Sequence, residues 1–334
     1  MHSIENIKGM IQMIENLLAK EFAYIKDGNV YFNVNKFKDY GKLSNKNPKE
    51  LISGSRVEIS ELKKNPLDFV LWKPSKDKEP FWESPWGKGR PGWHIECSVM
   101  SEKYLGKEFD LHCGGLDLIF PHHENEIAQS ICANDSHIFA KYWMHNGYVT
   151  VDGKKMSKSD GNFITINNLK NNFNGQIVRL SILGTHYRQP LDWNIKILET
   201  NKKILENWYS LYSPNEDEIN DELFNILLDD LNTPKFITNI HSLYNKAKTG
   251  DVVAKKNLNS ALKFLGLFEQ NEEQFNSLRK KSNLDISEIE NLIEKINLAR
   301  KDKDFKKADK IRLDLEKNGI LIEDLNNKTH WKHK

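Results

Sequence analysis

The sequence changes character near Asn194, and this change most limits the folds open to the chain. Beyond this position apolar residues recur at helical spacing with few turn residues, which predicts a bundle of helices. The predicted helices cover residues 195–212, 221–230, 234–248 and 252–267. A charged stretch at 269–283 is typical of a linker. The periodicity then predicts two more helices and a short strand, at residues 286–301, 305–317 and 320–322.

The first half of the chain mixes strand and helix patterns with many turn residues. Residues 4–21 repeat Ile, Met and Leu at helical spacing, and residues 22–34 alternate around Asp27-Gly28, which predicts a hairpin. Residues 73–92 are rich in proline and glycine, which predicts a loop. The segments expected to follow are a helix at 93–104, a strand at 109–112, a helix that opens at Pro121 and a strand-like run at 142–151.

Composition excludes several classes of protein. A chain of 334 residues with 38% hydrophobic residues is long enough for about two or three domains with real cores. It contains no run of ~18 apolar residues that could cross a membrane, and its start does not resemble a secretory signal. The net charge of +2 neither requires nor excludes nucleic acid. Three cysteines in no paired spacing favour a cytoplasmic enzyme, with at most one thiol as a metal ligand.

Two lysines in residues 155–159 form the first candidate site. Lys155 and Lys158 alternate with small hydroxyl residues between Gly153 and Gly161, in a loop after a predicted strand. Lysines on such a loop can close over a triphosphate and stabilise charge as it develops there. A solvated basic loop is the alternative, since lysine is abundant in this chain.

A second candidate site combines a thiol, an imidazole and a carboxylate. His122 and Glu126 are four residues apart after Pro121, so both project from one face of the predicted helix. With Cys97 from the preceding helix they would form three ligands for zinc. The alternative is that His122 caps the helix and Glu126 lies on the surface.

The glycines in residues 87–92 match the dinucleotide-binding pattern, and Asp110 follows about twenty residues later. A proline-broken loop precedes them instead of a buried strand, so we do not expect dinucleotide binding.

Several strings occur together in a fixed order. They are Pro91-Gly-Trp-His-Ile-Glu-Cys97, Gly114-Gly-Leu-Asp117, Phe120-Pro-His-His-Glu-Asn-Glu126, Tyr142-Trp-Met-His145 and the lysine segment. In this combination the chain resembles the bacterial cysteinyl-tRNA synthetase family, of class I. The resemblance continues through residues 230–234 and 308–312 to the C-terminus.

The resemblance implies ATP- and Mg-dependent activation of cysteine, followed by transfer to tRNA(Cys). It also implies one zinc ion, which selects cysteine because zinc prefers a soft sulfur to a hydroxyl. By position, Cys97, His122 and Glu126 resemble the zinc ligands, while Trp93 and Asp117 resemble the cysteine pocket. Lys158 resembles the lysine that contacts the ATP phosphates, with Lys155 in support. Trp93 as a core residue and Asp117 as a helix cap are the alternatives.

For the fold, the resemblance implies an α/β protein: the second half of a class I synthetase Rossmann domain with a connective insert, an all-α bundle and a small C-terminal domain. The expected ranges are 1–80 for the insert, 81–150 for the Rossmann half with the zinc site and 151–193 for the lysine loop and stem contact. The remaining ranges are 194–270 for the bundle and 284–334 for the C-terminal tRNA-binding domain. Trp331 and the tail lysines suit stacking and phosphate contact there, with a frayed terminus as the alternative.

The chain departs from the family pattern in one respect. It contains no His-x-Gly-His motif and no cysteine before Cys97, so three zinc ligands remain where the family uses four. A half-sheet of this kind would also expose a strand edge and apolar surface. We therefore expect this chain to need a separate N-terminal fragment for activity.

Three other functions compete with this interpretation. A tRNA-independent cysteine ligase has less use for the long helical region after Asn194. A non-catalytic tRNA- or zinc-binding remnant is disfavoured by the intact lysine segment and zinc-type residues. A zinc hydrolase would need a general base, for which Glu124 is the nearby candidate.

Overall fold

The computed structural model describes residues 3–45, 61–156, 161–214, 218–268, 286–302, 304–318, 320–325 and 328–333. They fall into two compact units, Met1–Gly147 and Tyr148–Lys334. Lys158 and the whole of the predicted linker, residues 269–283, lie outside the described residues. In the part of the chain that is described, no helix is long and apolar enough to cross a membrane.

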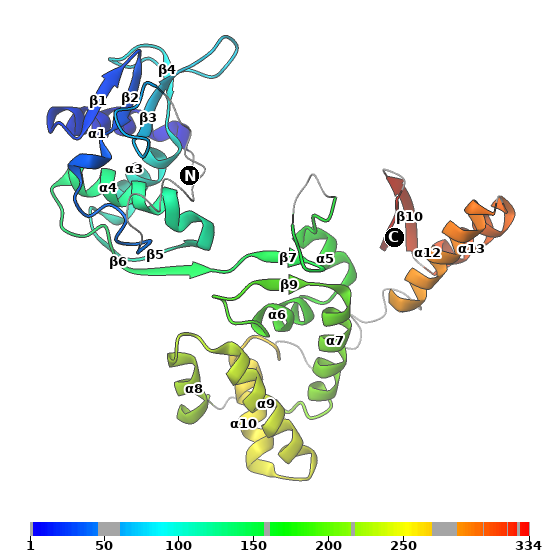
Figure 1. The fold of residues 1–334 in the computed structure, drawn as a ribbon. Helices are drawn as coiled ribbons and strands as arrows, with labels where there is room; N and C mark the ends of the chain where they lie inside the picture. Colours follow the sequence, from blue (N-terminus) through cyan, green and yellow to red (C-terminus); the bar gives the residue numbers. More distant parts are fainter. Residues whose placement is uncertain are drawn as a thin grey trace. The chain divides into compact units, whose positions relative to one another are not determined.

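In unit 1 the described residues form helices α1 (Ile7–Ala19), α3 (Trp93–Leu105) and α4 (Glu124–Asn134) and a four-stranded antiparallel sheet (Figure 1). These helices pack against one another. The sheet has the order β1 (Ala23–Lys26), β2 (Asn29–Phe32), β3 (Phe69–Pro74) and β4 (Gly89–Pro91). The predicted hairpin is confirmed: β1 pairs with β2 around Asp27 and Gly28, both of which have positive φ. A short 3₁₀ turn, Ser3–Asn6, precedes α1, and another, Val34–Lys36, follows β2.

The loop prediction for residues 73–92 is wrong in part. Their last residues form β4, which pairs antiparallel with the end of β3. A Cβ on Gly89 would lie 2.4 Å from Trp72 Nε1, so only glycine lets the backbone approach Trp72 this closely. Of the three glycines that resemble a dinucleotide motif, Gly87 precedes β4, Gly89 is the first residue of β4, and Gly92 is the N-cap of α3.

Unit 1 contains a second, two-stranded sheet. β5 (Phe109–Gly115) and β6 (Ala140–Asn146) pair in parallel, with α4 between them in sequence. The helix expected to open at Pro121 is instead preceded by a 3₁₀ turn, Leu116–Leu118, and by a π-helical turn, Ile119–His123. Phe120 is extended, as expected for a residue before proline, and this interrupts the helix before α4 begins.

The strand-like run at 142–151 is also two elements and not one. β6 belongs to unit 1, whereas β7 (Val149–Val151) belongs to unit 2. β7 pairs in parallel with β9 (Leu191–Trp193) and antiparallel with β8 (Lys154–Lys155).

Unit 2 is mainly helical, as the periodicity predicted (Figure 1). Its helices before residue 270 are α5 (Ile166–Asn172), α6 (Gly175–Leu183), α7 (Ile195–Tyr209), α8 (Asp221–Leu228), α9 (Thr233–Lys248) and α10 (Val252–Phe264). Each of α7 to α10 begins after an Asn or Asp whose side chain accepts a hydrogen bond from the backbone N–H three residues later. Trp208, Phe236 and Leu258 are among the buried residues of this helical core.

The last part of the chain has an apolar cluster of its own. Helices α12 (Ile286–Lys301) and α13 (Phe305–Lys317) pack together, and α13 contacts β10 (Ile320–Leu325). β10 pairs with β11 (Lys328–His333), so the tail is a hairpin strand and the frayed-terminus alternative is wrong. Trp331 packs partly buried against the cluster.

Candidate metal centre

Three elements of unit 1 bring the predicted metal ligands together. Cys97 lies one turn into α3, His122 lies in the π-helical turn, and Glu126 lies in the first turn of α4. Their ligand atoms, Sγ, an imidazole nitrogen and a carboxylate oxygen, all lie within 4.8 Å of one another. A thiol, an imidazole and a carboxylate are ligands that divalent transition metals accept.

The centre is buried. Glu126 is only 1% exposed, and its Oε1 lies 2.5 Å from His122 Nε2. The alternative in which Glu126 is a surface residue is therefore wrong. Burying a charged carboxylate is unfavourable unless it is paired or binds a cation. Each oxygen of Glu126 has an imidazole nitrogen beside it.

The sequence interpretation missed four histidines that surround these ligands. His94 Nδ1 lies 2.8 Å from His122 Nδ1, and His112 Nε2 lies 2.9 Å from Glu126 Oε2. His123 Nδ1 lies 2.8 Å from His145 Nε2. His112, His123 and Glu126 form a second group whose ligand atoms lie within 4.8 Å of one another. The doublet of His122 and His123, with a histidine on each flanking strand, was the available signal.

Burial sets the protonation of the cluster. It lowers the pKa of His94 to about 3, helped by the nearby His122, and it lowers the pKa of His123 to about 4. Burial alone would raise the pKa of Glu126, but hydrogen bonds from His112 and His122 outweigh it and hold this pKa at about 2. Burial and the Glu126 charge raise the pKa of Cys97 to about 12, so a metal ion that binds this thiolate must displace a proton.

These pKa values predict that unit 1 loses stability in mild acid. In the unfolded chain His94 and His123 take up protons near pH 6.5, whereas in the folded chain they do so only near about 3 and 4. Between these values the unfolded state holds more protons, so stability falls as pH falls. Each histidine contributes at most about 1.4 kcal/mol per pH unit to this slope.

Urea pulse proteolysis of the metal-free chain between pH 6.5 and 4.5 measures this slope, with fragments of unit 1 identified by mass spectrometry. His94→Gln should flatten the slope, and the same change at His137, an exposed histidine of unit 1, should leave it unaltered. An equal slope in His94→Gln and the unsubstituted chain would contradict the prediction.

Three of the four other predicted site residues lie in the described part of the chain, and Lys158 does not. Trp93 is 60% exposed, so the core alternative is wrong, and its ring centroid lies 4.4 Å from that of His122. Asp117 lies exposed in the 3₁₀ turn after β5; the N-cap of that turn is Gly115, so Asp117 is not its cap. Lys155 lies in β8, and Lys158 is outside the described residues.

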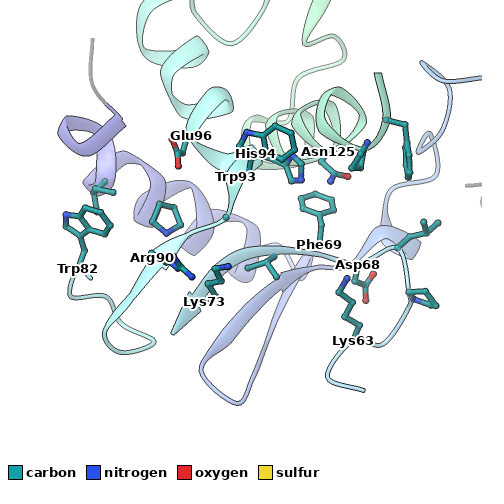
Figure 2. Close-up of a pocket in the computed structure, with 18 of the residues that line it drawn as sticks. Lys63, Asp68, Phe69, Lys73, Trp82, Arg90, Trp93, His94, Glu96 and Asn125 are labelled. Carbon is teal, nitrogen blue, oxygen red and sulfur yellow. The ribbon is translucent and has the colours of Figure 1, made fainter. Parts of the chain in front are cut away.

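A cavity of about 560 Å³ adjoins Trp93 and His94 on the side of the β3–β4 sheet. Figure 2 shows Lys73 and Arg90 on one side of Phe69, with Asp68 and Lys63 on the other. Arg90 is paired with Glu79 at 3.0 Å. The cavity is thus lined by positively and negatively charged side chains and by aromatic rings.

Glu124, the candidate base of a zinc hydrolase, is engaged elsewhere. It is buried and accepts hydrogen bonds from the backbone N–H of Gly41 and of Ser44, at 3.0 and 2.8 Å, and from the Ser44 hydroxyl. These bonds hold residues 41–44 against α4 and leave Glu124 no role at the metal centre.

Comparison with known proteins identifies the family. The family described as the class I (C) tRNA synthetase catalytic domain matches residues 1–203. A cysteine–tRNA ligase of Pelagibacter ubique is 52% identical over 333 residues, which are 99% of this chain and 74% of that protein. The cysteine–tRNA ligases of Rhodospirillum rubrum and Afipia carboxidovorans are 46% and 45% identical, over 98% and 96% of this chain and 74% and 70% of those proteins. On this evidence the chain belongs to the cysteinyl-tRNA synthetase family of class I aminoacyl-tRNA synthetases.

Proposed function

We propose that this chain carries the cysteine-selecting and tRNA-binding parts of a cysteine–tRNA ligase, with Cys97, His122 and Glu126 as the ligands of one zinc ion. The convergence of these three ligand atoms within 4.8 Å is the observation that carries the proposal. They come from separate segments of the sequence, and the donor set matches what zinc takes in proteins.

Zinc in this position would bind the substrate thiolate and lower the pKa of that thiol. The protein would leave one coordination position open for the sulfur of cysteine, so that a similar amino acid without a thiol is rejected. Because serine offers only a hydroxyl, it would be a far poorer ligand. Discrimination can then exceed the ~1–3 kcal/mol that a small change in an apolar pocket supplies.

We assign the remaining substrate contacts from the positions that these residues share with the family motifs. The exposed Trp93 ring beside His122 suits the wall of the cysteine pocket, and Asp117 suits the contact with the amino group. Lys158, with Lys155 in support, would bind the phosphates of ATP with Mg and stabilise the negative charge that develops there.

We assign the tRNA contacts to the second unit. Residues 151–193 would contact the acceptor stem, residues 194–270 would form the anticodon-side bundle, and residues 284–334 would form a small tRNA-binding domain. Residues 1–80 would be the connective insert and residues 81–150 the Rossmann half. In the last domain, Trp331 on β11 and the tail lysines would supply stacking and phosphate contacts.

The β5–β6 sheet suggests how the catalytic site is completed. Among the described residues β5 and β6 pair only with each other, so each strand has an unpaired edge. Leu111 on β5 and Tyr142 on β6 are also 52% and 70% exposed, although the faces of parallel sheets are usually buried. We infer that further strands, supplied by polypeptide outside this sequence, extend the sheet and add the missing ATP contact. Whether they belong to a preceding segment of one chain or to a separate fragment does not change the chemistry.

Cysteine-dependent exchange of pyrophosphate into ATP tests the proposal. We expect the purified 334-residue chain to bind one zinc ion and tRNA(Cys) but to show no exchange. A chimera that adds the uncovered N-terminal part of the P. ubique relative should restore exchange, and Cys97→Ala in that chimera should remove it. Exchange by the chain alone at the rate of an intact synthetase would contradict the need for added strands. Failure to bind tRNA(Cys) would contradict the tRNA assignment.

A further inference from the structure

An imidazole nitrogen lies within 2.9 Å of each carboxylate oxygen of Glu126, and only one of these two imidazoles belongs to a proposed metal ligand. Oε1 lies 2.5 Å from His122 Nε2, so these two ligand atoms converge on one point. Oε2 points to His112 Nε2, at 2.9 Å. If the metal assignment above holds, on which this inference rests, Oε1 faces the metal and Oε2 is left for His112.

The β5–β6 sheet and the aromatic rings around His112 restrict the orientation of its side chain. It lies in β5 in register with Trp143 of β6, and its side chain is only 16% exposed. Its ring centroid lies 4.8 Å from that of Trp143 and 5.5 Å from that of Phe139, and Phe109 packs at 5.6 Å. The sheet and three aromatic rings therefore set the direction of its Nε2.

We propose that His112 is a positioning residue for the metal centre: its Nε2–H donates to Glu126 Oε2 and leaves Oε1 as the one carboxylate oxygen available to the metal. Carboxylates that bind metals are commonly held in this way by a second hydrogen bond. Without the bond, the Glu126 side chain could rotate or bind through both oxygens, and the preformed geometry would be lost.

The other buried ligand is supported in the same manner. When His122 binds a metal through Nε2, its proton must lie on Nδ1, and that nitrogen is 2.8 Å from His94 Nδ1. His94 then accepts the hydrogen bond. In this arrangement His112 orients Glu126 and His94 orients His122, and neither His112 nor His94 binds the ion itself.

The competing interpretation is a second cation bound by His112, His123 and Glu126. Two divalent ions bridged by Glu126 would place four positive charges beside two ligand anions, Glu126 and Cys97, in a buried site. Uncompensated charge in such a setting is strongly unfavourable. The charge balance favours one ion with His112 as its outer support.

The decisive measurement is metal affinity and stoichiometry of the full chain, by chelator competition and native mass spectrometry with Zn²⁺. His112→Phe keeps a ring but removes the donor, and it should weaken zinc binding by ~10–100-fold with the stoichiometry still one. His112→Gln keeps an N–H donor and should restore most of the affinity. His112→Leu provides a second variant without the donor if the phenylalanine variant does not fold. His123→Gln, in the same cluster, should change zinc affinity little.

The outcomes separate this inference from the proposed function. One zinc ion bound equally well by the original chain and by His112→Phe would overturn the positioning role and leave the metal site intact. Two ions, reduced to one by both His112→Phe and His123→Gln, would establish the second cation site in its place. A chain that binds no zinc at all would overturn the metal site itself, and the positioning role with it.

Cobalt substitution gives an independent signal, because the thiolate-to-cobalt absorption of Cys97 should survive in His112→Gln.

Discussion

Replacing Glu126 by Gln should reduce zinc affinity by at least ~100-fold while the chain still folds. The substitution preserves shape but removes the anion that faces two imidazoles, His112 and His122, at 2.9 and 2.5 Å. Loss of an outer support alone costs about 10–100-fold in metal affinity, so loss of a ligand should cost more. Competition with a fluorescent chelator at neutral pH measures the effect, and metal content after dialysis provides an independent reading.

Glu124→Gln is the matched control for this prediction. Glu124 lies on the same helix and is as buried as Glu126, but it accepts hydrogen bonds from Gly41 and Ser44 and not from histidines. Its replacement should lower stability by ~1–3 kcal/mol, because buried donors lose their partner, and it should leave zinc affinity within a few fold. Equal loss of zinc in both variants would mean that unfolding of α4, and not ligand chemistry, removes the metal.

The sequence predicted that Cys97, His122 and Glu126 come together, but it did not predict the histidines that surround them. The spacing of His122 and Glu126 places both on one side of a helix, and that relation survives although a π-helical turn replaces the expected first turn. His94 and His112 carry no such spacing signal. They reach the site because α3 packs on α4 and because β5 lies beside it, which are tertiary relations.

Errors in predicting the elements have a similar origin. The strand β4 was not predicted because its one glycine and one proline have low strand propensity, and because its pairing with β3 depends on the tight approach to Trp72. The run from Tyr142 to Val151 favours one strand because aromatic and β-branched residues stand near both of its ends, whereas the boundary between the two units follows Gly147. The long helices of unit 2 were predicted best, since periodicity and Asn or Asp caps are local properties.

Truncation of Phe236 to Ala should destabilise unit 2 by about 3–5 kcal/mol and leave the metal centre intact. Phe236 lies on α9, is 0% exposed and belongs to the core that holds the helices of this unit before residue 270 together. Removing a buried aromatic ring loses its transfer free energy and leaves a cavity that the packed helices close only in part. Cys97, His122 and Glu126 lie in the other compact unit and share no core residue with Phe236.

Urea unfolding followed by pulse proteolysis should therefore show an earlier transition for fragments of unit 2, with zinc affinity unchanged. Phe305→Ala makes the same chemical change on α13, where the ring is 62% exposed, and should shift stability by no more than ~0.5 kcal/mol. A loss of zinc in Phe236→Ala below its unfolding transition would show that the two units are energetically coupled. In that case the metal centre could not be treated as a property of residues 1–147 alone.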